Sequence, residues 1–200
     1  MALPSFDLAA AVQAFITVFP AELPDKSMFA SMALATRFSK PRSVWLGAAG
    51  AFALHSVLAA AVGGFVSRLP MRPVAATAGA LFATGSVLML KQARSHVRAE
   101  AVAPDSGSTS TLAVIASSFM LLGVAEIGDL TQFAMAGLAA RTGEPLSVGL
   151  GGWVALCSVA ALAVSSGKWL TSRVQVATTQ LVGAAVFAAL ALWSFAETLS

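Results

Sequence analysis

Charged residues, tyrosine and cysteine are all scarce in this 200-residue sequence. Only 10% of its residues are charged, whereas 58% are hydrophobic, and a typical soluble domain has about 25% charged residues. This composition excludes an ordinary soluble domain and predicts an integral membrane protein. The single cysteine, Cys157, excludes an intramolecular disulfide framework. The net charge of +3 does not indicate nucleic-acid binding, because the basic residues are spread over short links.

Two further absences bear on targeting and on the source of energy. Residues 1–20 contain no Lys or Arg, whereas a cleavable signal peptide begins with a basic region. We therefore expect the N-terminal segment to belong to the first membrane span. No stretch resembles an ATP-binding motif, so a transport function would draw its energy from an ion gradient.

Four acidic residues lie in the middle of apolar runs, while the other five fall at the termini or in links. The four form two similar motifs, Glu22-Leu23-Pro24-Asp25-Lys26-Ser27 and Glu126-Ile127-Gly128-Asp129-Leu130-Thr131. A carboxylate at the centre of a span costs about 2.5–3.5 kcal/mol on insertion scales, and such residues often mark ion pathways. Structural pairing explains them poorly, because Lys26 is the only base within a motif.

Hydrophobic runs long enough to cross a bilayer recur six times, since a spanning helix needs about 20 mostly apolar residues. We expect an all-α membrane protein with spans at Phe6–Thr36, Ser43–Val66, Val74–Leu90, Thr111–Ala140, Leu146–Ser166 and Val174–Phe195. The first run would make a helix of about 45 Å, which is longer than a hydrocarbon core of about 30 Å. Because Pro20 and Pro24 flank the first motif, we expect the first and fourth spans to be kinked or broken at the acidic motifs.

The two motifs belong to a longer internal repeat. With an offset of 104 residues, positions 22–63 align with positions 126–167 without a gap, and 16 of the 42 pairs are identical. We therefore predict a duplication of three spans. Because three is an odd number, the two halves would run through the bilayer in opposite senses. This inverted-repeat plan is typical of secondary transporters, which bind their substrate between the repeats.

The predicted organisation is one membrane domain over residues 1–200, with repeat one at 6–90, a linker at 91–110 and repeat two at 111–197. Links one, three and five hold eight basic residues, and the links on the opposite side hold three. Because basic residues favour the cytoplasmic side, we expect a cytoplasmic linker. Both termini of this multi-pass cell-membrane protein would then be non-cytoplasmic. The sequence leaves both a monomer and a homo-oligomer open.

The acidic motifs contain the residue types of a site for a hard divalent cation. Residues i and i+3 share a helix face, so Glu22 can converge with Asp25, and Glu126 with Asp129. Calcium, magnesium and manganese prefer such oxygen ligands. The predicted metal-binding set includes neighbouring neutral oxygens: Glu22, Asp25, Ser27, Glu126, Asp129, Thr131 and Gln132. No His or Cys lies near either motif in the sequence, which argues against a zinc or copper site.

Proton exchange follows from the same residues. Four carboxylates close together in a low dielectric cannot all remain ionised. An empty site is therefore expected to hold protons, which a divalent cation displaces. The expected partners are the transported cation, protons and the lipid bilayer, with no separate cofactor.

Two other polar residues lie within the predicted spans. Lys26 either supplies a counter-charge to the acids or extends its amine to the membrane interface. His55 either relays protons or is hydrogen-bonded to a neighbour. Their repeat counterparts are Leu130 and Val159, so any role that they have is asymmetric between the halves.

Two other functions compete with cation exchange. A transporter of another small cation, such as an organic one, would favour a roomy pocket with aromatic lining over four converging acids. An intramembrane acid-dependent enzyme of the aspartyl protease type would carry Gly-x-Gly-Asp and Tyr-Asp motifs. Here Ile127-Gly128-Asp129 lacks the first glycine, and the sequence has no tyrosine. Catalytic carboxylates also usually need different environments, whereas this Glu–Asp pair is duplicated, so we predict that the protein is not an enzyme.

The doubled motif resembles that of a known family. Two copies of Glu-x-Gly-Asp-Lys/Arg-Ser/Thr in a duplicated six-span chain are similar to the Gdt-one/transmembrane protein 165 family of manganese or calcium/proton exchangers. The resemblance covers nearly the whole chain, and it implies that the four motif acids bind the cation with support from Ser27, Thr131 and Gln132. Pro24 replaces the family's glycine and Leu130 its usual basic residue, and either change can alter selectivity or coupling. The resemblance implies export of manganese or calcium from the cytoplasm in exchange for protons.

Overall fold

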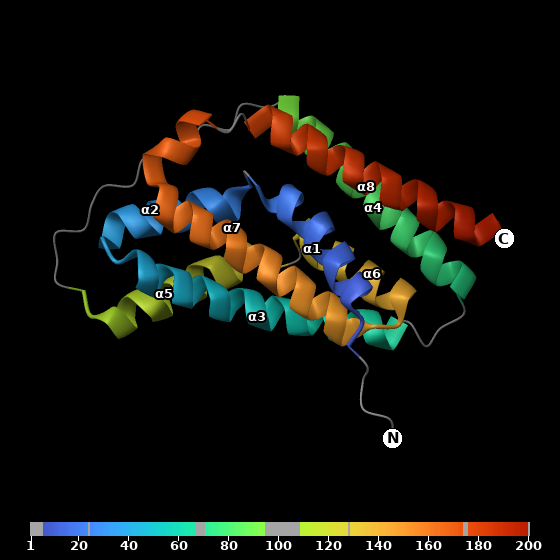
Figure 1. Cartoon of the computed structure of the whole chain (residues 1–200), viewed down its shortest axis with the longest axis horizontal. Coiled ribbons are helices and arrows are strands. Elements are labelled where there is room, and N and C mark those ends of the chain that lie inside the picture. The colour runs from blue at the N-terminus through green and yellow to red at the C-terminus, as the bar shows by residue number, and fades with distance from the viewer. Residues whose placement is uncertain are drawn as a thin grey trace, which may run out of the picture.

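The structure is a computed structural model that describes residues 6–23, 25–66, 71–94, 109–127, 129–173 and 176–199. In these residues the chain is helical throughout, as predicted, and no strand is present (Figure 1). The eight helices are α1 (Leu8–Glu22), α2 (Lys26–Phe38), α3 (Pro41–Val66), α4 (Met71–Arg94), α5 (Thr111–Ala125), α6 (Leu130–Thr142), α7 (Pro145–Arg173) and α8 (Val176–Leu199).

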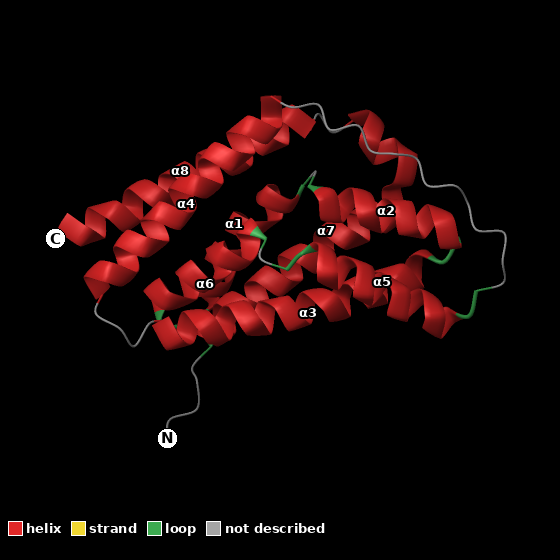
Figure 2. Cartoon of the chain, turned by 180° about the vertical axis from the view of Figure 1, so that it is seen from behind, coloured by secondary structure: helices red, strands yellow, loops and turns green. Residues whose placement is uncertain are grey.

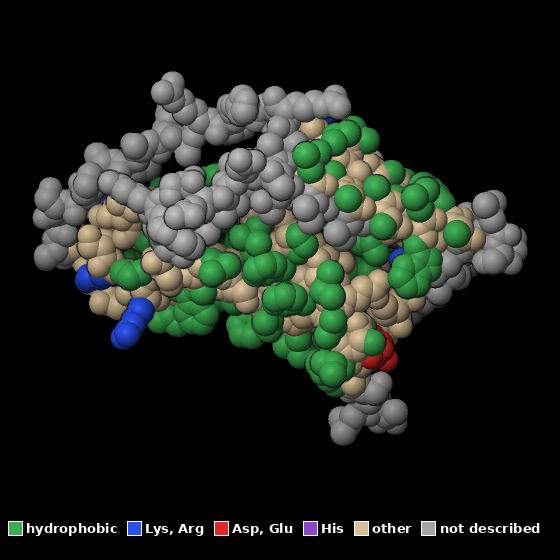
Figure 3. Space-filling model, turned by 45° about the horizontal axis from the view of Figure 1, so that its top comes forward, with side chains coloured by type: hydrophobic (Ala, Val, Ile, Leu, Met, Phe, Trp, Pro, Cys, Tyr) green, Lys and Arg blue, Asp and Glu red, His purple; other side chains and the backbone are tan. Residues whose placement is uncertain are grey.

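Two of these helices are long and apolar enough to cross a membrane, namely α3 and the Pro145–Ser165 part of α7. Helices α5 and α6 make a third candidate if the pair, which is bent by 74°, counts as one span. Large apolar side chains such as Leu58 and Phe65 are exposed at 55% and 67%. Figure 3 shows one face on which hydrophobic side chains predominate and few charged groups are present. Such a surface is suited to lipid rather than to water.

The helical path breaks at both acidic motifs, as the sequence predicts (Figure 2). The first break lies between α1, which ends at Glu22, and α2. The second break lies between α5, which ends just before Glu126, and α6. The two turns are alike, because the amide of Asp25 donates to the carbonyl of Glu22, and the amide of Asp129 to that of Glu126, both at 3.1 Å. Pro20 remains inside α1, so this proline does not end the helix. Pro24 and Gly128 lie outside the described residues.

The helices that follow the breaks also end alike. Ser39 and Gly143 terminate α2 and α6 in the left-handed conformation, with φ of 51° and 69°. Pro41 and Pro145 then begin α3 and α7, where the fixed φ of proline suits the first helical turn. Positions that are equivalent in the sequence repeat thus adopt equivalent local conformations.

Helices α3 and α7 cross in an antiparallel sense. The indole N–H of Trp45 donates to the carbonyl of Cys157 at 3.0 Å, and that of Trp153 to the carbonyl of Ala49 at 2.9 Å. Residue numbers rise along α3 as they fall along α7, so the two helices run in opposite directions.

Glycines bring the broken helices close to this crossed pair. A Cβ atom on Gly47 of α3 would collide with the carbonyl of Ile115 in α5. A Cβ atom on Gly151 of α7 would likewise collide with the carbonyl of Ala11 in α1. Small residues at both places therefore allow direct backbone contact, which is a common mode of helix packing in membranes.

Helices α4 and α8 pack against each other as a pair on one side of the molecule (Figures 1 and 2). Phe82 and Phe187 meet edge to face at 5.9 Å, and the Ser86 hydroxyl donates to the carbonyl of Ala184 at 2.8 Å. Among the broken helices, α8 packs on α1 and α4 packs on α6. The α4–α8 pair therefore contacts one helix on each side: α1 at the first break and α6 at the second.

The helix bounds differ from the predicted spans at several ends. Helix α4 continues to Arg94, four residues into the predicted 91–110 linker, and α7 runs to Arg173. These helices continue past the apolar runs because residues such as Lys, Gln and Arg have good helix propensity. The rest of the predicted linker, up to residue 108, lies outside the described residues.

Candidate metal centre

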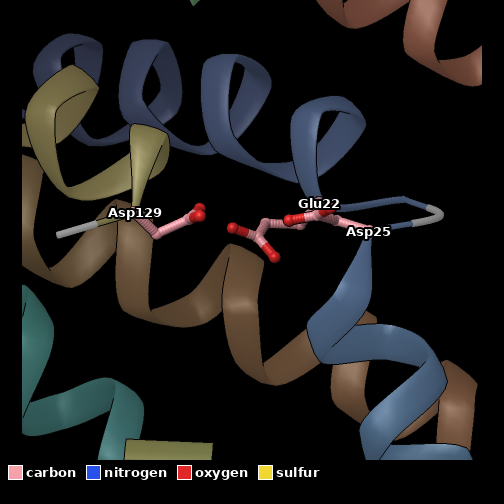
Figure 4. A group of neighbouring side chains, drawn as sticks. All are labelled: Glu22, Asp25 and Asp129. Carbon is pink, nitrogen blue, oxygen red and sulfur yellow. The ribbon is translucent and has the colours of Figure 1, made fainter. Parts of the chain in front are cut away.

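Three carboxylates meet where the two breaks face each other (Figure 4). One oxygen from each of Glu22, Asp25 and Asp129 lies within 4.8 Å of the others. Glu22 is the last residue of α1 and is fully buried, while Asp25 and Asp129 directly precede α2 and α6. The cluster therefore combines acids from both sequence motifs.

The break itself brings Glu22 and Asp25 together. The expectation that they share one helix face was wrong, because α1 ends at Glu22 and Asp25 lies beyond it. Asp is a favourable N-cap residue, yet neither Asp25 nor Asp129 forms a side-chain capping bond to its own helix. Both carboxylates are directed to the shared cluster instead (Figure 4).

Hydroxyl groups from both motifs converge on Glu22. The Ser27 hydroxyl donates to Glu22 Oε2 at 2.6 Å, and the Thr131 hydroxyl donates to Glu22 Oε1 at 2.8 Å. The Thr131 oxygen also lies 3.4 Å from Asp129 Oδ2. Short bonds of this kind stabilise a buried carboxylate, and each hydroxyl oxygen retains lone-pair capacity with which to bind a cation.

Glu126 is buried but does not belong to the three-acid cluster. It caps the C-terminal end of α5, and its side chain is 2% exposed. Its carbonyl accepts a hydrogen bond from the amide of Asp129, a member of the cluster, at 3.1 Å. The structure thus brings together three of the four acids that were expected to converge, and it holds the fourth in the same buried region.

Gln132, the remaining predicted ligand, lies at the second break. Its side-chain nitrogen donates to the carbonyl of Glu126 at 2.6 Å and also contacts Nδ1 of His55. Of the two roles considered for His55, hydrogen bonding to a neighbour is therefore present. The repeat counterpart of His55 is Val159, so the internal repeat carried no signal for this contact. The side chain of Lys26 lies outside the described residues.

The profile of a known family, described as the divalent cation/proton antiporter GDT1, matches residues 10–97 and 114–200 of the chain. The chain belongs to the GDT1 family. A GDT1-like protein from Synechocystis sp. is 29% identical over 195 residues, which cover 90% of this chain and 93% of that protein. No solved structure matches the chain. The predicted membership is confirmed, and GDT1 family proteins are membrane antiporters for divalent cations and protons, not enzymes.

Four helix ends surround the acidic cluster of this GDT1 family member. Helices α2 and α6 begin at the cluster, while α1 and α5 end there. The N-terminal end of a helix carries about half a positive charge, which offsets part of the negative charge of the acids. The C-terminal ends supply backbone carbonyls. Broken helices that present both kinds of end to an ion are a common way to build a transporter site.

The spacing of the acids fits one bound cation. Two ligands on opposite sides of a calcium ion lie about 4.6–5.2 Å apart, because each Ca–O distance is about 2.3–2.6 Å. The separation of at most 4.8 Å between the three carboxylate oxygens falls within this limit.

Proposed function

We propose that this GDT1 family protein exchanges manganese or calcium for protons and exports the cation from the cytoplasm. The observation that carries the proposal is the meeting of Glu22, Asp25 and Asp129, which come from both motifs, within 4.8 Å. The proposed ligands are the acids, hydroxyls and amide of the two motifs: Glu22, Asp25, Ser27, Glu126, Asp129, Thr131 and Gln132.

Competition for the same oxygens would couple the two ions. Three acids this close repel one another when all are charged, so an empty site retains protons and a divalent cation displaces them. Cation binding should therefore release protons, and cation affinity should fall as the pH falls. Each form can then cross the membrane, with the metal in one direction and the protons in the other.

We also propose that the chain forms six spans as two inverted repeats, at residues 6–90 and 111–197, joined by the 91–110 linker. In this arrangement α1 and α2 make the first span, and α5 and α6 the fourth. The antiparallel crossing of the equivalent helices α3 and α7 supports this plan. The matched glycine contacts at Gly47 and Gly151 support it as well, and the family profile matches one segment in each half.

The asymmetry of the site suggests how such repeats would alternate. Ser27 and Thr131 both donate to Glu22, although Glu22 and Glu126 are equivalent in the repeat. In the opposite state, the two hydroxyls would bond to Glu126. Helices α4 and α8 would correspondingly move from α6 and α1 to α5 and α2. Exchanging the roles of the two halves in this way opens the site to the other side of the membrane.

The proposed orientation follows from the basic residues. Arg37, Lys40 and Arg42 lie in the first link, and they favour the cytoplasmic side. Both termini would then be non-cytoplasmic. Labelling of single cysteines in intact cells tests this arrangement, and a label that reaches the 91–110 linker from outside would contradict it.

Transport in proteoliposomes with an imposed proton gradient tests the function directly. Manganese and calcium are compared, and internal pH is followed with a trapped dye. We expect at least one of the two metals to move and to drive protons the opposite way. Asp25→Asn and Asp129→Asn should abolish both movements, because each removes a charged member of the cluster while keeping its shape.

A wild-type protein that moves neither metal, in vesicles where a control exchanger works, would rule out these two substrates. Metal movement that is independent of the pH gradient would instead contradict proton coupling. Transport that persists in both Asn variants would mean that the cation binds elsewhere.

A further inference from the structure

The side-chain amide of Gln132 is held by both of its N–H groups. A carbonyl oxygen can only accept a hydrogen bond, so the Gln132 atom 2.6 Å from the Glu126 carbonyl must be the nitrogen. The same nitrogen contacts Nδ1 of His55. The amide nitrogen has two N–H bonds, and it contacts two acceptors, the Glu126 carbonyl and His55 Nδ1. Only the amide oxygen of Gln132 can then bind a cation.

His55 reaches the second break from α3, where it contacts Gln132. Because Gln132 donates to Nδ1, the ring proton of a neutral His55 lies on the other nitrogen, Nε2. The side chain of His55 is 5% exposed. One buried ring therefore contacts Gln132 in the helix after the break, and Gln132 in turn donates to the carbonyl of Glu126 at the end of the helix before it.

The first break has no such polar connection at the equivalent positions. The counterparts of His55, Gln132 and Gly123 are Val159, Met28 and Phe19. Met28 and Val159 belong to one buried apolar cluster, with Phe19 packed against it. The places of His55 and Gln132 thus hold a hydrogen-bonded pair in one half and an apolar pair in the other.

We infer that His55 is a positioning residue, which orients Gln132 so that its amide oxygen, and not its nitrogen, is the ligand for the transported cation. The inference rests on the proposed function. It assigns to the second break a neutral oxygen ligand that the first break cannot supply, since methionine takes the place of glutamine there. Hard divalent cations bind such amide oxygens, so the pair should influence both affinity and the preference between cations.

A double-mutant cycle in the full-length protein tests this role. The dissociation constants of manganese and calcium are measured by titration calorimetry for wild type, His55→Val, Gln132→Met and the double variant. The double variant reproduces the apolar pair of the first break, which favours correct folding. We expect each single variant to weaken binding about tenfold, as is usual for lost partners of a metal site. The ratio of the manganese dissociation constant to the calcium dissociation constant should change by the same factor in the two single variants.

The affinity loss of the double variant, compared with the losses of the two single variants, decides the result. If His55 acts through Gln132, the double variant should also lose about tenfold, rather than about a hundredfold. Losses that multiply, or an affinity unchanged by His55→Val, would overturn the inference. Met28→Leu in the first half is the matched control and should leave both constants unchanged.

A second variant covers the case in which His55→Val does not fold. His55→Gln retains a hydrogen-bond acceptor opposite Gln132 and should keep most of the wild-type affinity. A loss as large as that of Gln132→Met would contradict the positioning role. A wild-type protein that binds neither metal would instead overturn the proposed function, and the inference with it, so the two failures are distinguishable.

Discussion

The two helix breaks share a backbone design but differ in their surroundings. In each, an acidic residue at the end of one helix accepts a hydrogen bond from the amide of the aspartate that precedes the next helix. Next to the first break, Met28 and Val159 belong to one buried apolar cluster. Around the second, Gln132 contacts His55 and the carbonyl of Glu126.

A duplicated motif therefore need not give two equal half-sites. Glu22 joins the cluster with Asp25 and Asp129, while its equivalent Glu126 is buried beside it. Part of this inequality comes from sequence, since His55 and Gln132 have no polar counterparts. Part comes from conformation, because both motif hydroxyls bond to Glu22 although either acid could accept them. Four sets of substitutions test where the two halves differ and where they are alike.

The largest effect is expected from Glu22→Gln compared with Glu126→Gln. Glu22 belongs to the cluster and accepts two hydroxyls, so its loss should weaken cation binding by more than about 100-fold, beyond the usual cost of an outer partner. Glu126→Gln should weaken equilibrium binding less, yet it should stop transport if the opposite state uses Glu126. Calorimetry and proteoliposome flux measure the two properties. Equal binding losses would indicate that all four acids act together.

The next effect tests where the halves are alike. Gly47→Ala and Gly151→Ala each force a methyl group against a backbone carbonyl, and overpacking of this kind costs up to about 3 kcal/mol. We expect similar losses in the free energy of unfolding, measured by denaturation in mixed micelles. Gly123→Ala is the control, because the nearest atom to its added Cβ would be 3.8 Å away. A large loss at only one of the two sites would argue against equivalent packing.

A graft of the polar pair into the first break should have an intermediate effect. Met28→Gln with Val159→His places polar groups in an apolar cluster against which Phe19 packs. Incompletely bonded polar groups should reduce the free energy of unfolding by about 2 kcal/mol. The same unfolding assay measures it, with Met28→Leu as the control. A graft that is neutral would mean that the first break can also hold a polar pair.

The smallest effect concerns the matched ends of α2 and α6. Ser39 is left-handed without being glycine, a conformation that costs about 1 kcal/mol or more for other residues. Ser39→Gly should therefore stabilise the protein by about 1 kcal/mol, and Gly143→Ser should destabilise it by a similar amount. The midpoint of thermal unfolding in detergent should move up for the first and down for the second. Shifts of the same sign would contradict the equivalence of these ends.

Much of the fold could be predicted because it depends on local physics. Apolar runs predicted helices, and the two Glu–Asp motifs predicted where the first and fourth runs would break. Other local features were less decisive, because Pro20 is accommodated inside α1. The predicted ends of α4 and α7 were too short, since helix propensity continues past the point where hydrophobicity stops.

The chemical groups of the two motifs, namely carboxylates and hydroxyls in two copies within a membrane chain, follow from the sequence alone, and so does the family. Which of those oxygens meet depends on the packing of the helices. Glu22, Asp25 and Asp129 converge because two breaks face each other, and Gln132 contacts a histidine 77 positions away. Sequence spacing cannot encode such contacts, because they depend on how helices far apart in the chain pack together.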